Sequence, residues 1–455
     1  MSNKNYLEKY IEKRGYKVDV SALETIKITD LWYTNSENEF HKQVTVNGEP
    51  YDLERMNFAK RLCADDANLV EMIDVRCSAS GQSDEVIKNI LSKNKFNVQY
   101  RKQVEEMSAN GTVGAYVWLD NASLYEDGTI RGGDVRIEYC RAKDIYPLSV
   151  VNDEIIEVAF CGSYTVKGKP RYKIVMYLLH EGEYIAETHV FNETGKELTE
   201  ELQLIQLGDV KPFAIMRVAE NNNLKMKGYG FPKLLNAIPC LKVIDMTVTM
   251  WGRDLSKADK IVLINECLTG RDAQGNPKPL TPQMKNIFVQ IGANKLPEEK
   301  SLVQEYNPEI RIDSFVKSLE VSLSVLSMLY GFGTKKYTFE KGRIVTASEY
   351  VGEKQDSMQE INKQRAESIN YISDIVKAIA YFYEISGQGV LDVSDIEVDF
   401  DDSFIEDKTS VLESLKSDAL SFGVPKLTEL YLSKKYGFTP EEVKELMEER
   451  PLLID

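Results

Sequence analysis

The residue types that most often perform chemistry in proteins are sparse and scattered in this sequence. The histidines occur in no His-Glu-x-x-His pattern and beside no pair of cysteines; they are His41, His180 and His189. Because metal sites and histidine bases need convergent partners, we interpret them as surface or strand residues. The cysteines form no Cys-x-x-Cys pair, which predicts free, buried thiols in a reducing compartment; they are Cys63, Cys77, Cys140, Cys161, Cys240 and Cys267.

Signals for phosphate and metal sites are equally weak. No Gly-x-x-x-x-Gly-Lys-Ser/Thr loop is present, and the glycines at 331 and 333 follow an apolar helical pattern rather than a strand. Two pairs of adjacent acids, Asp65-Asp66 and Asp401-Asp402, have the chemistry to hold Mg²⁺, but adjacent acids on a surface are usually solvated. The sequence therefore predicts a protein that is not an enzyme, with no catalytic residues, cofactor or metal.

One segment departs from the charge of the rest of the chain. Residues 331–348 contain four basic residues and one acidic residue, Glu340, in a protein whose net charge is −16. The basic residues are Lys335, Lys336, Lys341 and Arg343. Glycines in the same segment favour conformational freedom. Either this is a surface loop whose lysines aid solubility, or it is a basic finger that contacts a phosphate backbone without reading bases.

Two apolar helical patterns precede this basic segment. Residues 231–258 and 313–330 both show apolar side chains at steps of three and four. Pro232 suits the first helical position, and Pro239 should kink the helix. The second pattern has an additional apolar row, so this helix needs cover on more than one face, and its serines at four-residue steps would let another backbone approach. The side chains we expect to pack are Trp251, Leu255, Phe315, Leu319, Leu323 and Leu326.

A third, very long helix is predicted after the basic segment. It opens with the capping-box spacing of Thr346 and Glu349 and continues to Ser386 before a glycine. At about 1.5 Å per residue it would span roughly 57 Å. Its second half is amphipathic, whereas residues 353–365 are polar on almost every side. Such a helix either bridges domains in solvent or packs between polar neighbours such as identical subunits.

The first half of the chain predicts an α+β domain. Helical patterns at 6–11, 53–73 and 84–91 come first, with a hairpin that turns at Asn47-Gly48. From Thr112 the apolar period becomes two, as in an antiparallel meander packed on helices. The expected strands lie near 112–119, 135–139, 155–160, 172–179, 184–190 and 213–218, with one more at 396–400 that returns to this domain.

The insert between the two apolar helices cannot be stable alone. Residues 259–311 predict only two short strands, 261–264 and 287–291, around a stretch rich in glycine and proline. Two strands are marginally stable in water, so we expect this insert to pair with another copy of the chain. Residues 405–455 predict helices, the last of them capped at Thr439, and their acidic balance argues against a DNA-reading helix-turn-helix.

Composition limits the possible functions. The 455 residues are 43% hydrophobic and 28% charged, as in an ordinary globular protein of two or three domains. The charge of −16 disfavours bulk attraction to nucleic acid or to anionic membranes, so any DNA contact must be local. We see no signal peptide and no unbroken apolar run of the roughly 18 residues that a membrane span needs. We therefore expect synthesis in the cytoplasm and no membrane partner.

The order of these parts resembles the portal proteins of tailed bacteriophages, particularly those of phages that infect Gram-positive bacteria. Three stretches carry the resemblance: Gly228-Tyr-Gly-Phe-Pro before the helix with Ile244-Asp245, Arg343-Ile-Val-Thr-Ala-Ser-Glu-Tyr at the start of the long helix, and Val398-Asp-Phe-Asp-Asp-Ser. The stretch that starts at Arg343 is similar to the family's Thr-Ala-Thr-Glu segment, with Ser348 and Tyr350 as departures. The resemblance covers nearly the whole chain.

The resemblance implies a ring of identical subunits, typically twelve, at one capsid vertex. The terminase motor would package double-stranded DNA through its channel, independently of sequence, and DNA would leave through it into the tail. The implied partners are other copies of the chain, the terminase large subunit, a head–tail adaptor, and the major capsid and scaffolding proteins. The protein would reside in the virion and, during assembly, in the host cytoplasm.

The resemblance also implies a layout of the portal fold. It has an α+β wing, two stem helices, a small α/β clip, a tunnel loop, a long wing helix and a helical crown. In this sequence the corresponding stretches are 1–230 with 349–404 (wing), 231–258 and 312–330 (stem), 259–311 (clip), 331–348 (tunnel loop), 349–386 (long wing helix) and 405–455 (crown). Lys335, Lys336, Lys341 and Arg343 would then face DNA.

Two other classes of function remain open at this point. One is a capsid, tail or scaffolding protein that never contacts DNA. The other is a DNA-processing enzyme, such as a nuclease, built on the acidic pairs.

Overall fold

The computed structural model describes most of the chain. The described residues are 4–42, 44–46, 49–77, 81–124, 130–198, 203–258, 261–265, 268, 271–276, 278–280, 288–291, 303–307, 309–333, 336–337, 347–400, 408–436 and 443. Two compact units are formed, each from separated stretches: Met1–Leu23, Ala64–Phe231 and Ala347–Asp455 in the first, Glu24–Cys63 and Pro232–Thr346 in the second. Residues 24–63 thus group with the two apolar helices, although the sequence placed them in the 1–230 domain.

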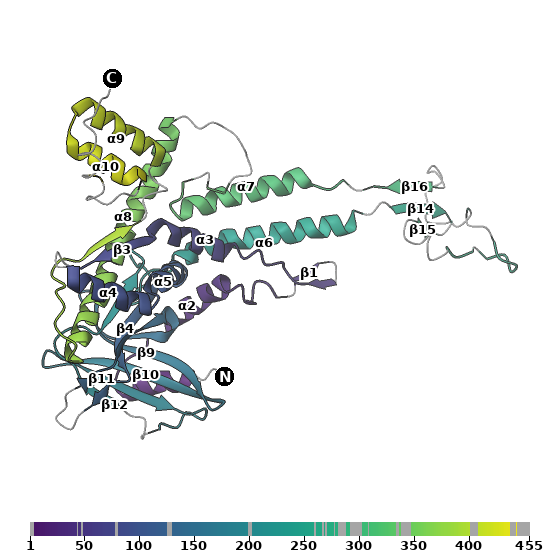
Figure 1. The fold of residues 1–455 in the computed structure, drawn as a ribbon. Helices are drawn as coiled ribbons and strands as arrows, with labels where there is room; N and C mark the ends of the chain where they lie inside the picture. Colours follow the sequence, from purple (N-terminus) through teal and green to yellow (C-terminus); the bar gives the residue numbers. More distant parts are fainter. Residues whose placement is uncertain are drawn as a thin grey trace. The chain divides into compact units, whose positions relative to one another are not determined.

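Two antiparallel sheets form the centre of the first unit (Figure 1). The larger sheet has the order β12-β11-β10-β9-β8, a meander of strands that are neighbours in sequence. Its strands are β8 (Ile145–Val151), β9 (Glu154–Val166), β10 (Lys169–His180), β11 (Glu183–Phe191) and β12 (Gln203–Gln206). The other sheet, of order β13-β4-β7, contains β4 (Thr112–Asp120), β7 (Asp134–Arg141) and β13 (Phe213–Arg217). The expected strands and the α+β class are confirmed: β9, β10 and β11 lie in the larger sheet, β4, β7 and β13 in the other, and the late strand in a separate pair.

Helices pack on both sheets of this unit. Leu7 and Ile11 of α1 (Lys4–Lys13) belong to a buried cluster with Ile174 and Met176 of the larger sheet. The other sheet packs against α5 (Phe96–Asn110) and α8 (Ala347–Ile385). The buried hydroxyl of Tyr371 on α8 donates a hydrogen bond of 2.7 Å to Oε1 of Gln103 on α5. The unit also contains α4 (Gly81–Lys93) and the short pair β5 (Ser123–Leu124) and β6 (Ile130–Arg131).

The long helix has the predicted extent, and apolar side chains of its second half are buried. It runs for 39 residues, and Ile372, Ile375 and Ile379 of its second half are completely buried. Its capping residue, Thr346, lies outside the described residues. After α8, β17 (Glu397–Phe400) pairs antiparallel with β3 (Met72–Arg76). This pairing confirms that the late strand returns to the first half of the chain.

The helix predicted over 53–73 is wrong at both ends, because only 58–67 is α-helical. The structure has α3 (Phe58–Ala67), a short 3₁₀ turn (Asn68–Val70) and then β3. Met72 and Val75 of β3 are buried at a spacing of three, which mimics a helical stripe. Pairing with β17, more than 300 residues away in sequence, outweighs this local pattern.

Two helices were not predicted from the sequence. In α2 (Val20–Tyr33) the buried residues Ile26 and Trp32 alternate with exposed apolar residues such as Val20 and Ile28, so no single stripe is visible. The other helix, α5, is extensively buried, including polar residues such as Gln103 and Asn110. A helix of this kind owes its position to tertiary packing and shows little amphipathic period.

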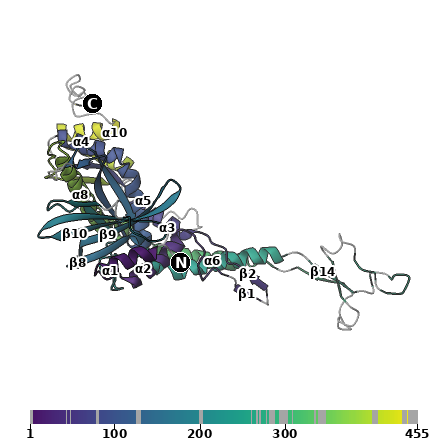
Figure 2. The ribbon, with the colours of Figure 1, turned by 90° about the horizontal axis from the view of Figure 1, so that it is seen from below.

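The second unit is built around two helices that lie side by side, α6 (Lys233–Lys257) and α7 (Ile312–Leu329) (Figures 1 and 2). Both helices were predicted, although Pro232 precedes the first helical residue instead of occupying it. The predicted hairpin is present as β1 (Val44–Val46) and β2 (Glu49–Tyr51).

The insert between α6 and α7 forms a three-stranded sheet. Its central strand, β14 (Ile261–Asn265), pairs in parallel with β15 (Phe288–Ile291) and antiparallel with β16 (Val303–Tyr306). The sequence predicted β14 and β15 but not β16, whose four residues include Gln304 and Glu305. Pairing of this insert with another copy stays a prediction.

The C-terminal region is helical, as predicted. It contains α9 (Lys408–Phe422) and α10 (Pro425–Tyr436). The expected cap of the last helix at Thr439 lies outside the described residues.

One segment of α6 satisfies the length and composition of a membrane span. It is Lys233–Ser256. Polar residues interrupt this segment, so a search of the sequence for an unbroken apolar run does not find it. The core helix of a soluble protein passes the same test, so this property alone assigns no membrane role.

Gly230 provides a test of the packing at the end of the first unit. A methyl group at this position would overlap the carbonyl oxygen of Gly111 and lie 2.9 Å from Cβ of Arg217. Gly230→Ala should therefore destabilise the unit by about 1–3 kcal/mol, as overpacking usually does, and should lower the Tm measured by calorimetry. Gly162→Ala, with no atom within 4 Å of the added methyl, is the control. Equal Tm values for the two variants would contradict the tight packing at Gly230.

Candidate functional site in the paired helices and the basic connector

The interface between α6 and α7 is apolar and close. The two helices contact each other, and both carry buried apolar side chains: Leu234, Ile238, Leu241 and Ile244 on α6, and Leu319, Leu323 and Leu326 on α7. Small polar groups also cross it, because Sγ of Cys240 donates to the carbonyl oxygen of Ser322 at 3.0 Å. The hydroxyls of Thr247 and Ser318 lie 3.2 Å apart. The serines of α7 thus permit close approach of a helix, and that helix is α6 of the same chain.

The side chains expected to pack in the two helices have different environments. Leu319, Leu323 and Leu326 are buried, and Phe315 is half-buried beneath the Arg311 guanidinium, which lies 5.4 Å from its ring centre. Leu255 remains 49% exposed. Trp251 is half-buried, and its Nε1 has no hydrogen-bond partner among the described residues.

A row of apolar side chains on α7 is left exposed by the described part of the chain. It consists of Val321, Val325 and Met328, exposed by 58%, 38% and 59%. Their spacing of four and three puts them on one helical face. On α6, Val243 and Met246 are exposed as well, by 40% and 43%. We call the three α7 residues the outer apolar row. The described part of the chain therefore satisfies only one of the two apolar faces that the sequence predicted for this helix.

A buried histidine–carboxylate pair fastens residues 41–56 to α6. Nε2 of His41 donates to Oδ2 of Asp245 at 2.8 Å, and the backbone N–H of Met56 donates to Oδ1 at 3.1 Å. Nearby, the N–H of Glu54 donates to the hydroxyl of Thr249 at 2.9 Å. The sequence interpretation of His41 as a surface or strand residue is wrong, because His41 is 5% exposed and lies in a turn. Its partner is 204 residues away, so no local pattern reveals the pair.

The environment of Asp245 raises the pKa of its carboxyl. Burial raises the pKa of its carboxyl, and the hydrogen bonds from His41 and from the Met56 N–H oppose that rise. The aromatic rings of Trp32 and Phe40 lie about 5 Å from the His41 ring. The groups that contact the pair are aromatic rings and a backbone N–H, which are not nucleophiles. The arrangement therefore holds residues 41–56 in place on α6.

The basic segment 331–348, which we call the basic connector, leaves α7 through a tight turn that packs against aromatic rings. Gly331 has φ 73°, a left-handed conformation that suits glycine at a helix end. The ring of Phe332 then lies between Tyr330 and Tyr337, with centroid distances of 5.7 Å and 6.3 Å. Tyr337 also meets Phe58 of α3 edge to face at 5.8 Å.

Only one of the four predicted basic residues lies in the described part of the chain. Lys336 is exposed, and its Nζ is 5.7 Å from the Phe332 ring centre. Lys335, Lys341 and Arg343 lie outside the described residues. Their proposed role therefore stays a prediction, and the structure adds an aromatic anchor at the start of the connector.

Other candidate chemistry is not assembled in the described residues. No group of three His, Cys, Asp or Glu side chains that could hold a metal is found there. Asp66 accepts a hydrogen bond of 2.6 Å from Ser108, whereas Asp401-Asp402 lies outside the described part. Cys63, Cys77, Cys140 and Cys161 are buried thiols outside any disulfide, as predicted, and Cys240 is a half-buried thiol outside any disulfide. Burial raises the pKa of Cys77 to about 12, so this thiol is unreactive at neutral pH.

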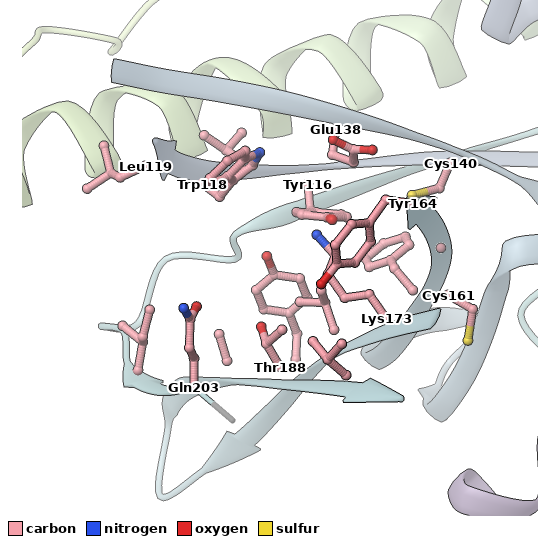
Figure 3. Close-up of a pocket in the computed structure, with 18 of the residues that line it drawn as sticks. Tyr116, Trp118, Leu119, Glu138, Cys140, Cys161, Tyr164, Lys173, Thr188 and Gln203 are labelled. Carbon is pink, nitrogen blue, oxygen red and sulfur yellow. The ribbon is translucent and has the colours of Figure 1, made fainter. Parts of the chain in front are cut away.

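The first unit contains a large groove between its two sheets (Figure 3). Its volume is about 1390 Å³. Tyr116 and Trp118 of β4 lie on one side, and Tyr164 and Lys173 of the β9–β10 hairpin lie on the other. No signal in the sequence marked these residues as functional, because they occur in ordinary alternating strand patterns.

The buried pair on α6 yields a measurable prediction. Asp245→Ala leaves the His41 Nε2–H and the Met56 N–H without an acceptor, which should destabilise the second unit by about 2–4 kcal/mol. Calorimetric unfolding would measure the loss. Asp254→Ala, on the same helix as Asp245, is the matched control. It removes an ion pair with Arg311 at 2.8 Å and should have a smaller effect because that pair is solvent-exposed. A larger loss for the control would refute the anchoring role.

One comparison with known proteins identifies a family. The family model for phage portal proteins of the SPP1 Gp6-like type matches residues 25–450. No curated protein matches the chain.

Proposed function

The chain belongs to the SPP1 Gp6-like family of phage portal proteins, and from this membership we propose that its copies form a ring that conducts DNA. As a portal protein it is a component of a bacteriophage capsid vertex and serves genome packaging. We further propose that the protein forms a ring, that the ring encloses a DNA channel and that it has about twelve subunits. The subunit number is taken from the family resemblance.

The observation that carries the proposal is the outer apolar row on α7. Fully burying a side chain of this kind is worth roughly 1.5–3 kcal/mol, so a helix that leaves three of them in water favours association. A second copy placed against α7 would cover the row. The exposed Leu255 on α6 would gain cover in the same way if a copy also contacted α6.

We assign the portal parts to the chain on this basis. The paired helices, 231–258 and 312–330, act as the stem, and the sheet within 259–311 acts as the clip. The wing is 1–230 with 349–404, including the long wing helix at 349–386; the tunnel loop is 331–348 and the crown is 405–455. Residues 24–63 share a compact unit with the stem helices, so we include their hairpin in the support of the stem.

The DNA contact in this proposal is electrostatic and local. A net charge of −16 repels a duplex from most of the surface, which lets DNA move without adhering. Lys335, Lys336, Lys341 and Arg343, repeated around a ring, would supply weak phosphate contacts that salt weakens. The aromatic stack of Tyr330, Phe332 and Tyr337 fixes the point at which the connector leaves the stem.

Energy for packaging would come from a partner. The sequence has no Gly-x-x-x-x-Gly-Lys-Ser/Thr loop for a nucleotide, so we assign ATP hydrolysis to a terminase large subunit that meets the clip. A head–tail adaptor would replace it after packaging, and the capsid and scaffolding proteins would surround the ring.

Val321→Asp tests the ring contact. A carboxylate in the outer apolar row would be buried against the neighbouring copy, and its desolvation should disperse the rings into smaller species. Light scattering after size-exclusion chromatography would measure the particle mass, and electron micrographs along the axis would show the rings. Val98→Asp, on α5 of the first unit, is a matched control because Val98 is also 58% exposed. Rings of unchanged mass in Val321→Asp would exclude this face as the subunit contact.

Replacing the four basic connector residues by Ala tests the DNA contact. The variant should assemble rings but package or retain less DNA per capsid, because each lost phosphate contact removes a salt-dependent part of the affinity. Replacing four lysines of the first unit, Lys88, Lys93, Lys95 and Lys102, by Ala gives the control. Normal DNA content in the connector variant would favour the competing function, a capsid, tail or scaffolding component that does not touch DNA.

A further inference from the structure

The β9–β10 hairpin concentrates positive charge. Between Glu157 and Glu181 the chain carries four cationic side chains and no acidic one, in a protein of net charge −16. The four are Lys167, Lys169, Arg171 and Lys173. They are spread through strand residues, so no dense run of charge marks them in the sequence.

Three of these cations share one face of the hairpin. Side chains alternate along a strand, so Lys169, Arg171 and Lys173 of β10 point to the same side at intervals of about 7 Å. Val175, further along that face, belongs to the core between the two sheets. The cations therefore form a stripe, which we call the basic stripe, that leads from the hairpin tip toward the groove.

The basic stripe has no anionic partner among the described residues. No ion pair is formed there by any of its three members, and Nε of Arg171 is buried without a hydrogen bond. Nζ of Lys173 instead lies 5.6 Å from the ring centre of Tyr116 and 6.0 Å from that of Trp118. A half-buried cation held only by ring faces attracts an incoming anion more strongly than a solvated one.

The groove at the inner end of the stripe suits an apolar side chain. Tyr116, Trp118 and Phe160 line it, and Gly162 leaves the wall opposite Lys173 without a side chain (Figure 3). Two acidic residues, Glu138 and Asp144, also line the groove. An anion thus fits over the stripe, and an uncharged group fits inside the groove.

The outer hairpin extends beyond its neighbouring strands. Pairing of β8 with β9 begins at Ile145↔Phe160, and pairing of β10 with β11 begins at Tyr172↔Phe191. Beyond Phe160, β9 therefore has β10 on one side and no described strand on the other. The outer hairpin, with Lys169 and Arg171, is therefore flanked by no described strand on either side.

We propose that the outer β9–β10 hairpin binds an extended acidic segment of a partner protein, with acids at alternate positions over the basic stripe and an apolar side chain in the groove. An extended peptide places alternate side chains about 7 Å apart, which matches the spacing of the stripe. A nucleic acid is disfavoured because it carries charge along its whole length, and both the groove acids and the net charge of the protein repel it. This proposal does not depend on ring formation or on the tunnel loop.

The test is a titration of the full-length protein with a short fluorescein-labelled peptide in which Glu alternates with Val and a Phe follows. Fluorescence anisotropy should report saturable binding that weakens as salt is added. Lys169→Glu with Arg171→Glu should weaken binding about tenfold or more, because both charges facing the peptide are reversed. Lys225→Glu with Lys227→Glu is the matched control: these lysines are exposed, the change in net charge is equal, and binding should persist.

Three outcomes would overturn the proposal. The first is absence of binding by the unaltered protein, and the second is equal binding by the two double variants. The third is tighter binding of a labelled DNA duplex or single strand than of the peptide, with the same loss in the stripe variant, which would reassign the stripe to nucleic acid. Circular dichroism of each variant confirms that the comparison is made between folded proteins.

Discussion

The arrangement of the second unit depends on one constraint: α7 has apolar side chains on two faces and only one covered face. Leu319, Leu323 and Leu326 are buried on the side that meets α6, and the outer apolar row stays in water. Small polar groups at Cys240, Thr247 and Ser322 let the helices approach without steric conflict. No described part of the chain covers the second face. Burial of this face against another copy is favourable, and this is the physical basis of the proposed subunit ring. Membership of the phage portal family indicates where such a ring would function.

Electrostatics divides the molecule in a different way. The net charge of the chain is −16, and two segments rich in cations depart from it: the connector after α7 and the β9–β10 hairpin. The first is entered from α7 through an aromatic stack, and we propose weak contacts with a moving polyanion there. The second is a rigid pair of strands with fixed side-chain spacing, which suits recognition of one extended segment. Similar charge on different backbones thus supports different kinds of partner.

The sequence predicted those elements whose pattern is local. The periods of α6, α7 and the second half of α8 were visible in the sequence, and β9, β10 and β11 of the larger sheet alternate between turn residues, whereas β8 and β12 were not predicted. The sequence could not predict β16, whose short polar strand depends on β14, or β3, whose identity depends on β17. Nor could it predict the His41–Asp245 pair, because nothing in the sequence around either residue indicates a partner so distant. The basic connector was found from composition, but its geometry lies mostly outside the described residues.

The interleaving of the two compact units has a consequence for biosynthesis. Each unit combines stretches that are separated in sequence by a stretch of the other unit. In addition, β3 can pair only after β17, more than 300 residues later in the chain, has been translated. A ribosome must therefore complete most of the polypeptide before either unit can close, and nascent chains would expose unpaired strand edges for that time. No contiguous fragment of the gene encodes one whole unit, so dissection by truncation is expected to yield aggregation-prone pieces.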